Sequence, residues 1–153
     1  MHMPRIASAL VALTLVACTD PGPLRLAVSV DRNSLVAQDS VKLSLELVNQ
    51  SLRTIKTPAP ESYGLCMHAF QVVDAQDREV GVASGFCFLL DLVAQPLIDL
   101  LPGQSITITD YWHPGSSTLD GHVIGPGEYR LIGRVFGDGE TITSGPTTVT
   151  LLP

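Results

Sequence analysis

The chain has 153 residues, 45% of them hydrophobic and only 16% charged, so its composition fits one folded domain and excludes a disordered chain. Fifteen Asp and Glu against nine Lys and Arg give a formal net charge of −6. This acidic balance excludes a broad electrostatic surface for nucleic acid.

The N-terminal segment has the layout of a secretory signal peptide. Arg5 precedes an apolar run, Ile6 to Ala17, and the polar segment Thr19–Pro23 follows. The run is too short for a bilayer-spanning helix, which needs roughly 20 apolar residues. Leu15-Val16-Ala17-Cys18 also resembles the lipobox of bacterial lipoproteins.

The lipobox resemblance implies that signal peptidase II cleaves before Cys18 and that fatty acids such as palmitate are attached there. The chain then divides into a signal peptide (1–17), a lipidated tether (18–23) and a domain (24–153). Several acyl chains anchor a protein stably, whereas one binds marginally. Thr19, in place of aspartate, favours the outer membrane in a diderm host. In other hosts we expect the outer face of the cell membrane.

The first part of the mature chain predicts half-buried strands. Leu24–Val30 and Val41–Leu47 alternate apolar and polar residues, the period of two that turns one face inward. Asp31–Ser34 predicts a turn between them. Leu52–Lys56 predicts a shorter strand, which ends at the prolines of Thr57–Pro60.

The middle of the chain is less regular. Ala69–Val73 and Glu79–Val82 predict strands that flank the polar turn Asp74–Asp77. Phe86–Val93 is strongly apolar, and its pattern leaves a buried strand and a helical turn both open. Leu97–Leu101 leads into a Pro102-Gly103 turn.

Two cysteines of the mature chain remain after Cys18 is assigned to lipid. Outside the cytoplasm an even pair is usually bonded, so we expect a Cys66–Cys87 disulfide. Closing a loop of this length stabilises a fold by roughly 3 kcal/mol in the chain-entropy model. Two separate buried thiols and a metal site are the alternatives.

The last third has the clearest strand pattern. Ile106–Trp112 is rich in β-branched residues, and a polar loop, His113–Gly121, follows it. Tyr129–Phe136 and Thr141–Leu152 flank a tight turn at Gly137-Asp138-Gly139. Eight or nine short strands with Pro and Gly turns predict an all-β, two-sheet antiparallel β-sandwich.

Several of these turns and strands resemble bacterial immunoglobulin-like domains, and most closely the intracellular proteinase inhibitor-like family. The matching segments are Leu101–Ser105, the threonine-rich strand ending at Trp112, Gly121, Pro126–Leu131, Leu45–Ser51 and Asp74–Asp77. The resemblance covers about residues 40–136 and implies an Ig-like sandwich. By analogy it also implies protease inhibition through an exposed loop such as Pro114–Gly121. Tyr129, at a strand start, predicts a tyrosine corner.

Four other groups of residues have side chains that are suited to binding or catalysis. Cys66-Met67-His68 offers soft ligands for copper, with His113 or His122 as a further ligand, although a disulfide cysteine beside ordinary strand residues also fits. Asp74 and Asp77 lack the ladder of a calcium loop and predict a solvated turn. Ser116, Ser117 and Asp120 lie in one loop and have the side-chain types used in nucleophilic catalysis. The loop lacks the Gly-x-Ser-x-Gly motif that presents a catalytic serine, so a plain polar loop also fits. Tyr111, Trp112 and Tyr129 fit a sugar-stacking platform, or else Trp112 belongs to the core.

The sequence therefore predicts a lipid-anchored cell-envelope protein with a non-catalytic Ig-like domain for interaction or structure. Its expected partners are the membrane, through lipid on Cys18, and an envelope protein. We expect no catalytic residue, metal, cofactor, nucleic acid or small-molecule substrate. A protease inhibitor and a periplasmic copper-binding protein are the alternative functions.

Overall fold

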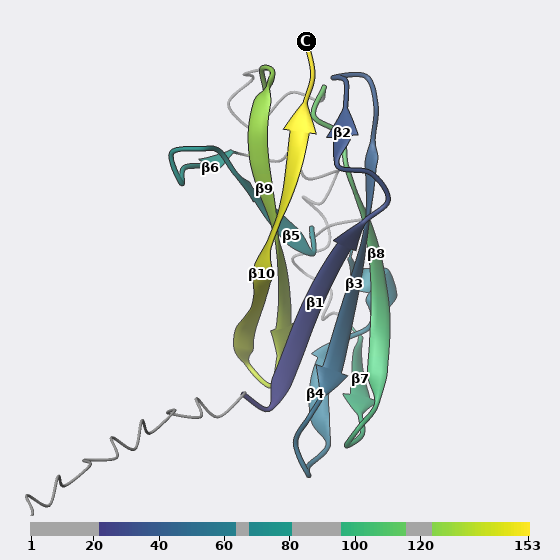
Figure 1. Cartoon of the computed structure of the whole chain (residues 1–153). Coiled ribbons are helices and arrows are strands. Elements are labelled where there is room, and N and C mark those ends of the chain that lie inside the picture. The colour runs from purple at the N-terminus through teal and green to yellow at the C-terminus, as the bar shows by residue number, and fades with distance from the viewer. Residues whose placement is uncertain (1–21, 64–67, 81–95, 116–123) are drawn as a thin grey trace, which may run out of the picture.

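A computed structural model describes residues 22–63, 68–80, 96–115 and 124–153. Within these ranges the chain forms ten strands and one short 3₁₀ helix (Figure 1). They are β1 (Leu24–Val30), β2 (Ser34–Leu35), β3 (Val41–Asn49), β4 (Ile55–Pro58), η1 (Pro60–Ser62), β5 (Phe70–Val73), β6 (Glu79–Val80), β7 (Leu97–Leu100), β8 (Ser105–Trp112), β9 (Gly127–Gly137) and β10 (Glu140–Leu151).

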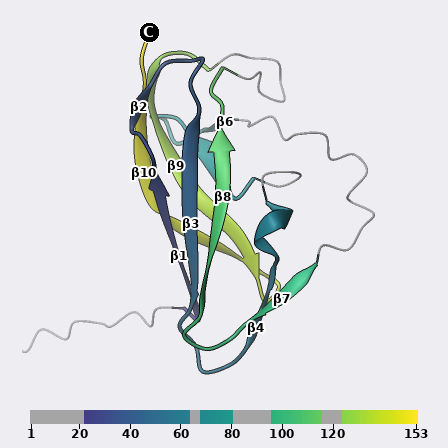
Figure 2. The same cartoon turned by 90° about the vertical axis from the view of Figure 1, so that its right-hand side faces the viewer.

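The strands form two facing sheets, which confirms the predicted all-β sandwich. One sheet has the order β1-β3-β8, and the other has the order β2-β10-β9-β5-β6. A separate antiparallel pair, β4-β7, lies at the lower end of the molecule in Figures 1 and 2. Within the described ranges, no helix is long and apolar enough to cross a membrane.

The core lies between the sheets and follows from the alternation of the strands. On β3 every second residue from Val41 to Asn49 is fully buried, and the residues between them are exposed or half-buried. β8 turns Ile108 and Trp112 into the same core, and β9 contributes Leu131 and Val135. These inward-facing rows produce one continuous hydrophobic cluster.

The β9–β10 connection is the tight hairpin that the sequence predicts. Gly137 pairs with Glu140, so Asp138 and Gly139 alone form the turn. Both residues have positive φ angles, 53° and 84°, as a type I′ turn requires. The twist of this turn therefore matches the twist of β9 and β10, the two strands that it joins.

Two expectations from the sequence need correction. The turn expected at Asp31–Ser34 ends one residue earlier, because Ser34 belongs to β2, and β2 pairs in parallel with β10, so the sandwich is not wholly antiparallel. Leu52 lies in a loop, because the short strand begins at Ile55 and includes Pro58. The expected strand Glu79–Val82 is present as β6 over Glu79–Val80, and residues 81–82 lie outside the described ranges. The ambiguous run Phe86–Val93 lies outside the described residues.

The segment from β4 to Tyr63 is hydrogen-bonded to the end of β9 and to the turn that follows it. The hydroxyl of buried Thr57 donates to the carbonyl of Phe136 at 2.9 Å, and the Phe136 N–H donates to the Tyr63 hydroxyl at 3.2 Å. The Asp138 N–H also donates to the Lys56 carbonyl at 2.8 Å. The segment from β4 to Tyr63 is thus attached to β9 largely through side chains.

Candidate functional site

The residues singled out most strongly by the sequence lie outside the described ranges. They are Cys18, Cys66 and Cys87, together with Met67, Ser116, Ser117, Asp120 and His122. The lipidation site and the Cys66–Cys87 disulfide therefore remain predictions. His68, His113 and the aromatic residues of the sequence analysis are described, and they lie in three different settings.

His68 lies beside a buried carboxylate that the sequence analysis missed. Asp110 on β8 has an exposed fraction of 2%, and its oxygens lie 3.3 Å from His68 Nδ1. They also accept the backbone N–H groups of Ala69 and Tyr111, each at 2.7 Å. Asp110 thereby joins β8 to the start of β5, across the two sheets.

A sequence signal for Asp110 did exist. The inward face of β8 reads Ile106, Ile108, Asp110 and Trp112, so an acid occupies a core position in an alternating strand. A buried acid needs hydrogen-bond donors from elsewhere in the chain. Among the described residues, no group of three or more His, Cys, Asp and Glu is placed to hold a metal ion.

The aromatic residues do not form one platform. Trp112 has an exposed fraction of 1% and packs edge-on against Tyr129, with ring centroids 5.8 Å apart. Tyr111 points to the opposite side of β8, where it is half-exposed and stacks on His113 at 6.4 Å. Trp112 is therefore a core residue.

Tyr129 forms the predicted tyrosine corner. Its hydroxyl donates to the carbonyl of Gly125, four residues upstream, at 2.7 Å. Burial raises the pKa of this phenol above its usual value of 10.0, and the negative charge of Asp74 raises it further. The bond fixes the path of the chain into β9.

The Asp74–Asp77 segment is the solvated turn that its sequence predicts. One Asp74 oxygen accepts the N–H groups of Gln76 and Arg78, and the other accepts the Arg78 side chain. These hydrogen bonds, chiefly the one from the Arg78 backbone, lower the pKa of Asp74. Arg130 from β9 pairs with Asp77 and closes the turn onto the sheet.

The end of the sandwich where the described chain begins is the best-organised surface, and we call it the base. It comprises Pro23, the β3–β4 loop (50–54), the β7–β8 turn (101–104) and the β9–β10 turn (138–139). Backbone hydrogen bonds at the end of β3 connect three of these parts. The N–H of buried Asn49 donates to the Gln104 carbonyl, and its carbonyl accepts from the Gly103 N–H. The N–H of the next residue, Gln50, donates to the Pro23 carbonyl. The base is therefore one hydrogen-bonded unit.

The Asn49 side chain fixes the β3–β4 loop. Its amide nitrogen donates to the carbonyls of Arg53 and Leu100, both at 2.8 Å. Its amide oxygen accepts from the N–H and the hydroxyl of Ser51, at 2.9 and 2.7 Å. All the polar capacity of this buried amide is used, so the loop has a defined conformation.

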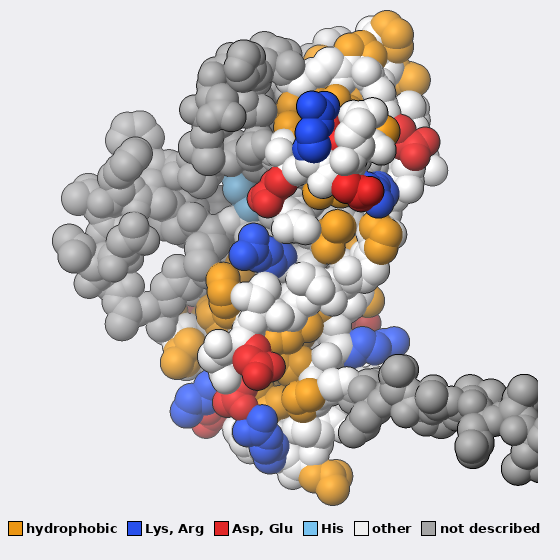
Figure 3. Space-filling model, turned by 90° about the vertical axis from the view of Figure 1, so that its left-hand side faces the viewer, with side chains coloured by type: hydrophobic (Ala, Val, Ile, Leu, Met, Phe, Trp, Pro, Cys, Tyr) orange, Lys and Arg blue, Asp and Glu red, His pale blue; other side chains and the backbone are white. Residues whose placement is uncertain are grey.

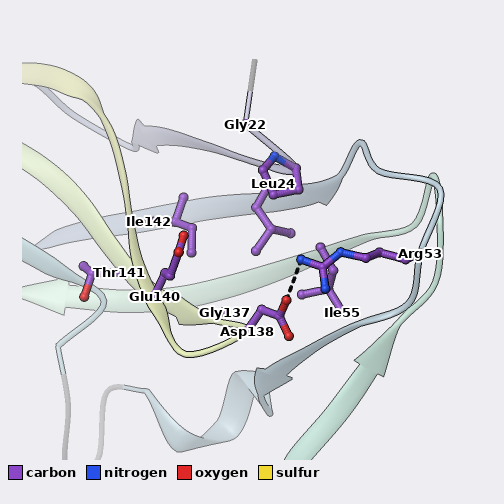
Figure 4. A pocket seen from close by; sticks show the side chains of 10 residues that line it. Gly22, Leu24, Arg53, Ile55, Gly137, Asp138, Glu140, Thr141 and Ile142 are labelled. Atoms are coloured by element: carbon purple, nitrogen blue, oxygen red, sulfur yellow. Dashed lines mark ion pairs between the residues drawn. The ribbon is translucent and has the colours of Figure 1, made fainter. Parts of the chain in front are cut away.

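An open groove of about 430 Å³ runs along one side of the base (Figure 4). Leu24, Ile55 and Ile142 supply its apolar wall. Across it Arg53 reaches Asp138 in an ion pair of 2.6 Å, drawn as a dashed line in Figure 4. The groove therefore combines an apolar wall with the two charges of Arg53 and Asp138, which are paired with each other.

The described fold is an all-β sandwich with a hydrogen-bonded base, and comparisons with known proteins add limited information. No family model matches the chain, and no curated protein matches it. Among solved structures, the β-glucosidase EmGH1 from Erythrobacter marinus is similar over 84% of this chain and 15% of its own, with 16% identity and a TM-score of 0.49.

Two further solved structures show similar partial likeness. The Pseudomonas fluorescens alkylpurine DNA glycosylase AlkC, bound to DNA with an abasic-site analogue, matches 86% of this chain and 31% of its own, with 14% identity and a TM-score of 0.49. The structural-genomics target SoR45 matches 85% and 88%, with 10% identity and a TM-score of 0.40. The chain thus spans less than a third of the two named enzymes.

Proposed function

We propose that this chain is a lipid-anchored protein of the bacterial cell envelope, in which acylated Cys18 holds a non-catalytic β-sandwich at a membrane surface. The observation that carries the proposal is the arrangement of the N-terminus. A lipobox-like sequence ends at Cys18, and the first core strand begins at Leu24, after a spacer of five residues, Thr19–Pro23. Such a spacer is a tether, because it is too short to form a domain.

The described polar groups support a structural or interaction role for the sandwich. The buried carboxylate of Asp110 is occupied by two backbone N–H groups and His68, and buried Asn49 is saturated by its own loop. These contacts join strands and loops to one another within the sandwich. The domain would then act in the envelope by holding a protein partner near the lipid surface.

The location of the protein follows from the same segment. Cleavage before Cys18 removes Arg5, which leaves eight cations against fifteen acids and a net charge of −7. Such a body gains no attraction from an anionic lipid surface, so acyl chains must supply the anchoring. Thr19 favours the outer membrane in a diderm host, and the outer face of the cell membrane is the location in a monoderm.

Mass spectrometry of the chain expressed in a bacterial host tests the proposal. We expect a mature N-terminus at Cys18 that carries fatty acids, and we expect Cys18→Ser to keep the leader and carry none. Labelling with a clickable palmitate analogue should give the same contrast. An intact leader, or an unmodified thiol at position 18, would refute the proposal.

The same purified protein, left unreduced, tests the Cys66–Cys87 bond. We expect the tryptic peptides with these cysteines to migrate as one linked species that separates after reduction. Alkylation of both thiols without prior reduction would contradict the disulfide.

Chemical cross-linking in intact envelopes then identifies the protein partner, and recovery of no neighbour would argue against an interaction role.

A further inference from the structure

Leu52, at the tip of the β3–β4 loop, is almost fully exposed. Its exposed fraction is 98%, the largest among the described large hydrophobic side chains. Single exposed leucines are common on protein surfaces and need no explanation by themselves. Leu52 is unusual because the residues on both sides of it, Ser51 and Arg53, are held by the buried Asn49 amide. An apolar side chain is thus presented on a fixed loop.

This loop lies beside the start of the described chain. The Gln50 N–H donates to the Pro23 carbonyl at 2.9 Å, so Leu52 lies two residues from a direct contact with the N-terminal segment. Five residues, Thr19–Pro23, connect that contact to Cys18, and their full extension is about 17 Å at 3.3–3.6 Å per residue. If Cys18 is acylated, the base with Leu52 faces the lipid.

Two ion pairs lie in the base and next to it. Arg53 pairs with Asp138 at 2.6 Å, and Lys56 pairs with Asp99 at 2.7 Å. Leu101, in the adjacent β7–β8 turn, adds a second apolar side chain with an exposed fraction of 47%. In Figure 3 a hydrophobic side chain likewise projects at the lower tip, below a group of paired blue and red side chains. Within the base as defined, the one acid, Asp138, is thus paired with Arg53.

We propose that the base is a membrane-contacting surface, in which Leu52 inserts between lipid headgroups and Leu101 rests against them. The proposal rests on the acylation of Cys18 proposed above. The acyl chains supply the anchoring, and the two leucines set the orientation of the sandwich on the bilayer. Because β3 ends and β10 begins at the base, and both strands extend from it along the length of the sandwich, this contact makes the sandwich stand upright on the lipid.

Tryptophan quenching by brominated lipid tests this orientation. The acylated full-length mature chain is reconstituted into phosphatidylcholine vesicles whose acyl chains carry bromine near the headgroup. In the parent the only tryptophan, Trp112, is buried and gives the baseline. Leu52→Trp and Leu101→Trp place a reporter at the base. Leu152→Trp, at a 42% exposed position at the opposite end, is the matched control.

We expect brominated lipid to quench the tryptophan at position 52 strongly and that at position 101 partly, with a blue-shifted emission at position 52. The parent and Leu152→Trp should lose no fluorescence. Absence of quenching at both base positions, or equal quenching at positions 52 and 152, would overturn the proposal. Mass spectra of the same samples distinguish the acylation of Cys18 from the membrane contact of the base. Protein without acyl chains would refute both proposals. Acylated protein whose base tryptophans are not quenched would refute only the membrane contact.

Discussion

Four hydrogen bonds hold the Asn49 side chain, and they explain why one polar residue occupies the last inward position of β3. The amide satisfies two carbonyls, of Arg53 and Leu100, and two donors of Ser51. Buried donors and acceptors that lose a partner cost about 1–3 kcal/mol each. The stability of the whole base therefore depends on this side chain.

Replacing Asn49 by aspartate tests this dependence with almost no change of shape. The substitution replaces the amide NH₂, which donates to the carbonyls of Arg53 and Leu100, by a negatively charged oxygen that cannot donate. We therefore expect the free energy of unfolding to fall by about 3 kcal/mol or more at neutral pH. Urea denaturation measures the loss. Gln50→Glu makes the same chemical change at the exposed neighbouring position and should stay within about 0.5 kcal/mol of the parent. Equal stability of the two variants would show that the Asn49 network is dispensable.

Single residues were also where the sequence was hardest to interpret. Two of the partners of Asp110, His68 and the Ala69 N–H, lie about forty positions away, so the alternation of β8 reveals a buried acid but not these partners. Tyr129 was easier, because its partner lies four residues upstream and the corner is a local motif. The pattern of Leu52–Lys56 predicts a strand, because it does not reveal that Asn49 binds the Arg53 carbonyl and holds Leu52 in a loop.

At the scale of elements, β9 and β3 approach closely at Gly133. A Cβ on Gly133 would lie 2.9 Å from Leu45 Cδ2, 3.1 Å from Ser144 Oγ and 3.2 Å from Leu26 Cδ2. The Gly133 N–H also donates to Ser144 Oγ at 2.8 Å, at the irregularity where the β9–β10 register shifts. The absent side chain lets the two sheets meet over the leucines of β1 and β3.

Gly133→Ala should therefore destabilise the sandwich. Leu26 and Leu45 are both buried, so their ends have little room to move, and we expect a loss of about 1–3 kcal/mol from overpacking. Gly145→Ala is the matched control, since a Cβ there has no heavy atom within 4 Å. Thermal denaturation of both variants compares them, and a Gly133→Ala melting temperature as high as that of Gly145→Ala would contradict a tight contact.

Elements differ in how well their sequence predicts them. β1, β3, β8, β9 and β10 follow the alternation or the turn chemistry of their own residues, and the structure places them within two residues of the expected bounds. β2 has only two residues and exists because it pairs in parallel with the distant strand β10. β4 and η1 depend on contacts with β9, and no local pattern encodes those contacts.

For the whole molecule, two tyrosines determine how stability changes at alkaline pH. Burial raises the pKa of Tyr63, although the hydrogen bond from Phe136 partly lowers it, and burial and Asp74 raise the pKa of Tyr129. The folded state thus holds both phenol protons more tightly than the unfolded chain does. Their contribution is complete below pH 10, the usual phenol pKa, and is lost as pH rises through 10 toward the raised values.

We therefore expect the free energy of unfolding to fall as the pH rises through 10, as measured by urea denaturation at pH values on both sides of 10. The slope should be shallower in the double variant Tyr63→Phe, Tyr129→Phe, whatever its stability at neutral pH. Tyr111→Phe, at the half-exposed position on β8, is the control and should keep the parent slope. An unchanged slope in the double variant would exclude these tyrosines as the cause.

The described part of the chain begins at the base, and Pro153 follows β10 at the far end of the sandwich (Figure 1). At about 3.3 Å per residue, the twelve residues of β10 span on the order of 40 Å. In an upright, acylated chain, a tag or receptor fused after Pro153 would be displayed farther from the lipid than the hydrocarbon layer is thick, about 30 Å. The sandwich would then serve as a rigid stalk of set height.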